Sequence, residues 1–242
     1  MNDDDKKRMD DYYGQECFKS LPYKLNIGFF RWDWSPVYRR IRSFLRPYSV
    51  LDDGGGFGAL RPYCVGMDYT NLDPSIGMLN IDAGQNDTKV LGVGENLPFT
   101  DELFDNVVSC AVLRFVTEEQ KYLREAYRVL KHGGVLVLVN ATNDYPYNLT
   151  RHPFLFWVPL IYNYQKKHHG DETRWKENLM SGEDIVAMIK STGFSVKHTE
   201  HVTRHLPWLW IFKPDSRFLW TLARLFMRKK DGQYLLVICN KP

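Results

Sequence analysis

The sequence predicts an α/β fold in which a mainly parallel sheet is covered by helices on both faces. Strand-like and helix-like segments alternate along the chain, and several strand-like segments are apolar throughout rather than alternating. Strands of that kind are typical of sheets buried on both faces. The 242 residues and the 44% hydrophobic content suit one such domain with added segments.

The elements of the first half begin with a helix over residues 35–45. Ser35 is its expected N-cap, Pro36 occupies the first helical position, and the apolar residues share one face. A charged N-terminal segment precedes this helix, and strands follow it over residues 48–51, 69–73, 89–93 and 103–113.

The second half continues the alternation of helices and strands. A helix is expected over residues 117–130, opening with Thr117 and acidic residues and followed by a turn at KHGG. A helix with Ser181 as its cap is expected to end at Gly193. The expected strands cover residues 135–139, 194–202 and 232–242.

Composition narrows the classes of function. The formal charge of +3, from 32 basic and 29 acidic residues, gives no argument for binding nucleic acid, and none is expected. The N-terminal stretch is charged and lacks an apolar signal region, and no apolar run reaches the roughly 18 residues of a membrane span. A soluble, cytoplasmic protein is therefore expected. No zinc-type spacing and no metal site are expected from the four scattered cysteines, Cys17, Cys64, Cys110 and Cys239.

The stretch VLDDGGGFGAL joins the first strand to a glycine-rich loop, and two interpretations compete for it. With Gly54, Gly56 and Ala59 it matches the G-x-G-x-x-G/A turn of dinucleotide-binding domains. With Asp52 in front of Gly54, Gly56 and Gly58, it is similar to the acidic loop that binds S-adenosylmethionine. The loop alone leaves both cofactors open.

Either cofactor needs a carboxylate about 20 residues further on to hold the ribose hydroxyls. Asp73 follows Gly54 by 19 residues and ends a strand-like segment. Asp68 is the alternative, but it leaves only residues 59–63 for the crossover between two strands. Asp73 is the predicted ribose ligand, and even so the first crossover helix is expected to be short.

Motifs further along the chain separate the two interpretations. The segments VLGVGENLPFTDELFDNVVSCAVLRFV and LREAYRVLKHGGVLVLV carry an acid before LPF, an FD strand start and EA-x-RVLK-x-GG in one register. This arrangement resembles the class I S-adenosylmethionine-dependent methyltransferases of the small-molecule, methyltransferase type 11-like family. The resemblance is strong over residues 50–139 and moderate over residues 181–242.

The resemblance implies a Rossmann-like sheet of seven strands, the last one antiparallel, with an aromatic cap over the site. It also implies the cofactor S-adenosylmethionine, with S-adenosylhomocysteine as its product. By this resemblance, Asp52 orients the loop and the cofactor's ammonium group, and Gly54, Gly55 and Gly56 let the backbone approach the cofactor closely. Asp73 binds the ribose hydroxyls, and Cys110 contacts the methionine part of the cofactor. The residues expected to contact the adenine are Pro74, Glu95 and Asn96.

Several residues depart from the family pattern. Asp53 and Gly55 stand where a hydrophobic residue and a cysteine are usual, and Val93 stands where an aspartate often precedes the adenine-contacting pair. Arg114 and Phe115 occupy the place of a frequent histidine. A general base, where the reaction needs one, is therefore expected elsewhere, and His152 is the candidate.

Segments outside the sheet are expected to bind the acceptor within a single domain spanning residues 1–242. They are an N-terminal arm or lid over residues 1–47 and a cap insertion over residues 143–180. Packing of these aromatic residues on the sheet is the competing interpretation. The candidate substrate contacts are Tyr12, Tyr13, Trp32, Tyr145 and Trp157.

The overall prediction is a methyltransferase that acts on an oxygen or nitrogen of a small molecule, with natural-product, sugar and lipid-linked acceptors all open. The amphipathic stretch 206–230 fits packing on the sheet, a dimer contact or a membrane surface. Two other functions compete: a catalytically silent partner with a methyltransferase fold, and an NAD-dependent oxidoreductase.

Overall fold

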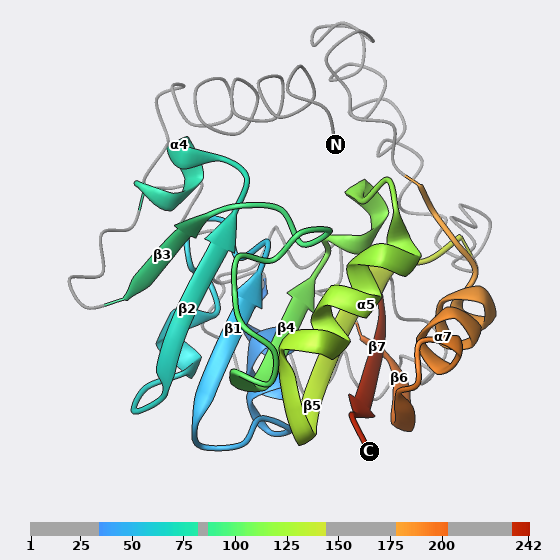
Figure 1. Ribbon diagram of the computed structural model, residues 1–242. Coiled ribbons are helices and arrows are strands. Elements are labelled where there is room, and N and C mark those ends of the chain that lie inside the picture. The colour runs from blue at the N-terminus through green and yellow to red at the C-terminus, as the bar shows by residue number, and fades with distance from the viewer. Residues whose placement is uncertain (1–33, 82–86, 144–177, 203–233) are drawn as a thin grey trace, which may run out of the picture.

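A computed structural model describes residues 34–81, 87–143, 178–202 and 234–242. Its centre is a seven-stranded sheet in the order β3-β2-β1-β4-β5-β7-β6 (Figure 1). The strands are β1 (Ser49–Asp53), β2 (Asp68–Asp73), β3 (Thr88–Leu91), β4 (Phe104–Cys110), β5 (Leu130–Ala141), β6 (Ser195–Val202) and β7 (Tyr234–Asn240).

The sheet has the predicted strand directions. β1 to β5 pair in parallel wherever they are neighbours, whereas β7 is antiparallel to both β5 and β6. The chain builds the sheet outward from β1 to β3 and then returns to the other side of β1 with β4. The loops after β1 and β4 therefore diverge, which is where open α/β sheets bind ligands.

Both faces of the sheet are covered, as the apolar strands predict. One core joins the sheet to α5 (Glu119–Val129) and α7 (Gly182–Ser191), and Figure 1 shows α5 in front of the central strands. The other core packs the opposite face against the helical residues 34–42. The remaining short elements are the 3₁₀ turns η2 (Arg61–Tyr63) and η3 (Leu113–Phe115) and the single turn α4 (Ile76–Leu79).

Three local predictions need correction. Trp34 is already helical, so Ser35 is not the N-cap; the buried Trp34 ring packs on Tyr234 instead. Helix α5 starts at Glu119, and the Thr117 hydroxyl lies 3.5 Å from Glu95 rather than capping the helix. The predicted KHGG turn is part of β5, which runs from Leu130 and contains Gly133 at a φ of +71°.

The first crossover is as short as expected, because its only helical element is η2. The Ser181 cap of α7 is confirmed, since its side chain accepts a hydrogen bond from the Asp184 amide. Within the described ranges, no helix is long and apolar enough to span a membrane.

Candidate functional site

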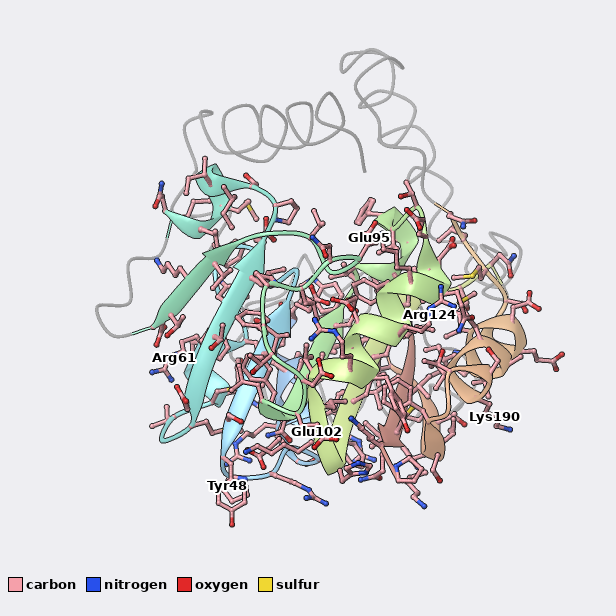
Figure 2. The ribbon with its side chains drawn as sticks, in the orientation of Figure 1. Tyr48, Arg61, Glu95, Glu102, Arg124 and Lys190 are labelled. Atoms are coloured by element: carbon pink, nitrogen blue, oxygen red, sulfur yellow. The ribbon has the colours of Figure 1, made fainter. Side chains whose placement is uncertain are left out.

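The candidate site lies at the carboxyl edge of the parallel strands, where β1, β2 and β4 end side by side. Asp53 at the end of β1 is level with Ser109 near the end of β4 and with Leu72 of β2. Figure 2 shows Glu95 at this edge and Tyr48 at the opposite one. The two ends of the sheet are thus chemically distinct, with buried acids gathered at the carboxyl edge.

The glycine loop offers backbone rather than side chains to this edge. Gly54 and Gly56 have φ angles of +75° and +56°, which L-residues with side chains rarely adopt. A Cβ on Gly55 would lie 2.6 Å from the Asp52 carboxyl carbon and would overlap the amide of Asn71. The Asn71 amide donates to the Gly56 carbonyl at 2.8 Å and holds the loop from β2. Only a bare backbone fits here.

Asp73 is hydrogen-bonded to the backbone of the loop. One of its carboxylate oxygens accepts a hydrogen bond from the Gly56 amide and the other from the Ser75 amide, both at 2.9 Å. Each oxygen can accept further bonds, so the carboxylate can take a pair of vicinal hydroxyls. Asp68 is exposed at the start of β2, at the opposite end of the sheet, so it is not a candidate for this edge.

Asp52 is buried on the same face of the sheet as Tyr69 of the neighbouring strand β2. Its carboxylate accepts a hydrogen bond of 2.5 Å from the Tyr69 hydroxyl. Burial raises the pKa of Asp52 to about 7, the bond from Tyr69 opposes that shift, and the charge of Asp73 adds to it. The Asp52 carboxyl group lies against Gly55 of the loop. Its role in orienting the loop and the cofactor's ammonium group stays a prediction.

The loop after β3 carries the predicted adenine contacts, Glu95 and Asn96. The buried Glu95 lies next to Thr117, whose amide is 3.4 Å from its carboxylate. Asn96 forms a short antiparallel bridge with Val93, which folds the loop back over the sheet. Pro74 follows Asp73 directly, at the start of the neighbouring loop. The structure thus brings the predicted ribose and adenine contacts to one edge.

Cys110 ends β4 and is half-buried at the same edge. The next residue, Ala111, has a φ of +64° and donates its amide to the Val139 carbonyl at 2.7 Å. This strained turn presses Val112 against Gly54, where a Cβ would overlap its side chain. β4 therefore shapes the wall of the loop as well as supplying Cys110.

The sequence interpretation missed a buried polar group beneath the loop, made by Asp53, Ser109 and Tyr122. The Tyr122 hydroxyl donates to the Ser109 hydroxyl at 2.7 Å, and Asp53 lies beside them. The only sequence signal was Asp53 itself, an acid at a position where the family resemblance leads one to expect an apolar residue.

Some predicted residues lie outside the described ranges. They are the general-base candidate His152, the substrate contacts Tyr12, Tyr13, Trp32, Tyr145 and Trp157, and the amphipathic stretch 206–230. Their roles stay predictions, as do the arm and the cap.

Comparison with known proteins shows a similarity to one family. The family model described as a methyltransferase domain matches residues 51–138. The matched segment runs from β1 to β5 and includes the glycine loop and the loop after β3. This similarity favours the adenosylmethionine interpretation of the loop over the dinucleotide one.

Two curated relatives show how far the sequence similarity extends. An uncharacterized protein of Methanocaldococcus jannaschii is 29% identical over 118 residues, which is 48% of this chain and 51% of the relative. The chain thus spans about half the length of that protein. The demethylmenaquinone methyltransferase of Thermotoga maritima is also 29% identical, over 63% of this chain and 72% of the enzyme.

Solved structures extend the similarity of this chain at the level of the fold. The methyltransferase solved with the Trm112 activator of Haloferax volcanii gives a TM-score of 0.63 at 19% identity, covering 96% of this chain and 97% of the other. The Burkholderia thailandensis 1,6-didemethyltoxoflavin-N1-methyltransferase, solved with S-adenosylhomocysteine, gives 0.55 at 15% identity, covering 92% and 91%.

Proposed function

We propose that this protein is an S-adenosylmethionine-dependent methyltransferase that acts on an oxygen or nitrogen of a small-molecule acceptor. The observation that carries the proposal is the pairing of a bare glycine backbone with the Asp73 carboxylate at the switch point of the sheet. Support for the small-molecule class comes from the relatives whose names state their acceptors, demethylmenaquinone and 1,6-didemethyltoxoflavin.

The residues at the carboxyl edge fit the adenosyl cofactor. The carboxylate of Asp73 accepts hydrogen bonds from the ribose hydroxyls. The loop from Gly54 to Gly56 leaves room for the methionine part of the cofactor because it projects no side chain. Glu95 and Asn96 hold the adenine. When bound, the cofactor supplies a methyl group that is already electrophilic because it sits on a sulfonium.

The protein's own contribution is then positioning and removal of water. A site that fixes the acceptor atom in line with the methyl group converts a bimolecular reaction into an effectively unimolecular one. The half-buried side chains of Val112 and Cys110 border the loop and limit the access of water to it. His152 remains the candidate for taking the proton that an oxygen or nitrogen acceptor loses.

Thermal unfolding with three ligands tests the proposal. S-adenosylmethionine and S-adenosylhomocysteine are expected to raise Tm, whereas NAD is not. A ligand at about 100 times its Kd adds roughly 2.7 kcal/mol, or roughly 5–10 °C for a chain of this size. A shift with NAD alone would overturn the proposal. Binding of the adenosyl ligands without methyl transfer to any acceptor would favour the catalytically silent alternative.

A further inference from the structure

Asp53 is a buried acid that the proposed cofactor contacts do not use. It ends β1 next to Asp52, but successive side chains of a strand point to opposite faces. Asp52 therefore faces Tyr69, whereas Asp53 faces Tyr122 of α5. Asp53 is 1% exposed, and its Oδ2 atom has no hydrogen-bond partner in the described part of the chain. An unpartnered carboxylate oxygen at this depth is costly.

The surroundings of Asp53 are built to accommodate this carboxyl group. A Cβ on Gly94 would lie 2.7 Å from Asp53 Oδ2 and would overlap the Tyr122 ring, so the loop after β3 crosses over both side chains as bare backbone. The Tyr122 hydroxyl donates to Ser109. Asp53 thus lies directly under the loop that carries the proposed adenine contacts.

Among the described residues, the charged groups that act on Asp53 are all negative. Its neighbours include Glu95 from the loop after β3, Asp52 on its own strand and Asp73 from β2, each of which disfavours a second negative charge. Burial is the larger cause, and burial and these charges together raise the pKa of Asp53 to about 7, while the neighbouring Tyr122 hydroxyl opposes the shift. Within the described ranges, no lysine or arginine forms an ion pair with Asp52, Asp53 or Glu95.

Such an edge favours a ligand that brings positive charge. S-adenosylmethionine carries a sulfonium, whereas S-adenosylhomocysteine is a neutral thioether at the same atom. In the transfer, the bond from sulfur to the methyl carbon breaks, its electron pair stays on sulfur, and the carbon bonds to the acceptor's lone pair. The cofactor therefore loses one positive charge while it is held beside these acids.

We propose that Asp53 is a specificity-determining residue, whose buried charge makes the site prefer the sulfonium cofactor to its thioether product. The inference rests on the function proposed above, since it needs the adenosyl cofactor at this edge. Asp53 acts through its charge rather than by contact with the cofactor. Because methyl transfer removes the positive charge from sulfur, the site binds the product less tightly than the cofactor. Asp53 thereby links methyl transfer to product release.

Calorimetric titration of the full chain with S-adenosylmethionine and S-adenosylhomocysteine tests this inference. The wild type is expected to bind the sulfonium form more tightly. Asp53→Asn is expected to narrow the ratio of the two Kd values by about fivefold to tenfold, the size expected for a charge acting over roughly 12–17 Å at an effective dielectric constant near 20. Asp68→Asn, which removes an exposed acid at the other end of β2, is the matched control and leaves the ratio unchanged.

Proton release separates an electrostatic role from a structural one. At pH 7, titrations in buffers of different ionisation enthalpy are expected to show net proton release when the wild type binds S-adenosylmethionine, and less release with S-adenosylhomocysteine. Asp53→Asn reduces that release, and the Asp52 carboxyl accounts for what remains. The wild-type ratio is also expected to grow from pH 6 to pH 8 as Asp53 ionises.

The outcomes also separate this inference from the proposed function. If neither adenosyl ligand binds the wild type, the proposed function is wrong. If both bind equally tightly at pH 8, and the titrations at pH 7 show no proton release, the function stands and the role of Asp53 is overturned. That wild-type result decides the matter even where Asp53→Asn does not fold.

Discussion

Asp53 and Asp52 place two carboxyl groups side by side in the chain and fully inside the protein. Burial raises the pKa of each to about 7, and neither has a basic partner in the described ranges. A core that placed an apolar residue at position 53 would avoid the unpartnered Oδ2 atom. A residue that costs stability at the edge of a candidate site is typical of a trade of stability for function.

The stability cost of burying Asp53 depends on pH, and the direction in which its pKa is shifted determines whether the cost rises or falls with pH. Aspartate titrates near 3.8 when exposed and near 7 at position 53 in the folded chain. The folded state therefore holds this proton more tightly, and the contribution of Asp53 to stability is present below pH 4 and lost as the pH rises to 7. Asparagine has no proton to lose.

We therefore predict that the free energy of unfolding of Asp53→Asn, relative to that of the wild type, increases between pH 5 and pH 8. Integrating the shift gives an upper bound of roughly 2–4 kcal/mol. Urea unfolding of both proteins without ligand, at pH 5, 6.5 and 8, measures the difference. A difference that stays constant over this range would show that Asp53 does not titrate with a raised pKa.

At the scale of elements, helix α5 holds the loop that carries Glu95 and Asn96. The Arg128 guanidinium donates to the carbonyls of Leu97 at 3.0 Å and Phe99 at 2.7 Å. Glu125 accepts from the Leu97 amide at 2.8 Å and from Arg128, so the pair clamps both sides of the loop. The LPF and EA-x-R motifs are thus connected in the structure, because Glu125 and Arg128 of α5 hydrogen-bond to the backbone of the loop after β3.

Replacing Arg128 with lysine is expected to loosen this clamp, because an ammonium group cannot reproduce the planar fork that reaches two carbonyls and a carboxylate. We predict a loss of about 1–3 kcal/mol in the free energy of unfolding and a loss of about threefold to tenfold in cofactor affinity. Arg124→Lys is the matched control, since Arg124 is exposed on the same helix (Figure 2). Equal cofactor affinity in Arg128→Lys and Arg124→Lys would show that the contacts of Arg128 do not contribute to cofactor binding.

At the scale of the whole molecule, much of the architecture is predictable from local patterns. Apolar strands without alternation indicated a sheet covered on both faces, and the ordered motifs indicated seven strands with the last antiparallel. The edge at which Asp73 lies followed from its place at the end of a strand. The covered sheet and the position of Asp73 are each encoded within one segment, so periodicity and spacing reveal them, whereas the number of strands and the direction of the last one came from the family resemblance.

Features that depend on contacts between distant segments could not be predicted in this way. The group formed by Asp53, Gly94 and Tyr122 brings together a strand, a loop and a helix far apart in the chain. The missed cap at Ser35 has the same cause, since the packing of Trp34 on Tyr234 overrides the local signal. The acceptor site stays a prediction because its expected residues lie outside the described ranges.

The proposed function requires that the carboxyl edge of the sheet binds an adenosyl cofactor through Asp73. Asp73 and Asp68 occupy the two ends of β2, so Asp73→Asn and Asp68→Asn remove the same charge at opposite edges. Titration of S-adenosylhomocysteine into both variants and the wild type tests the claim most directly. We predict that Asp73→Asn weakens binding at least about tenfold, as expected for hydrogen bonds to a charged group, and that Asp68→Asn binds like the wild type. Equal binding by all three proteins would contradict the claim.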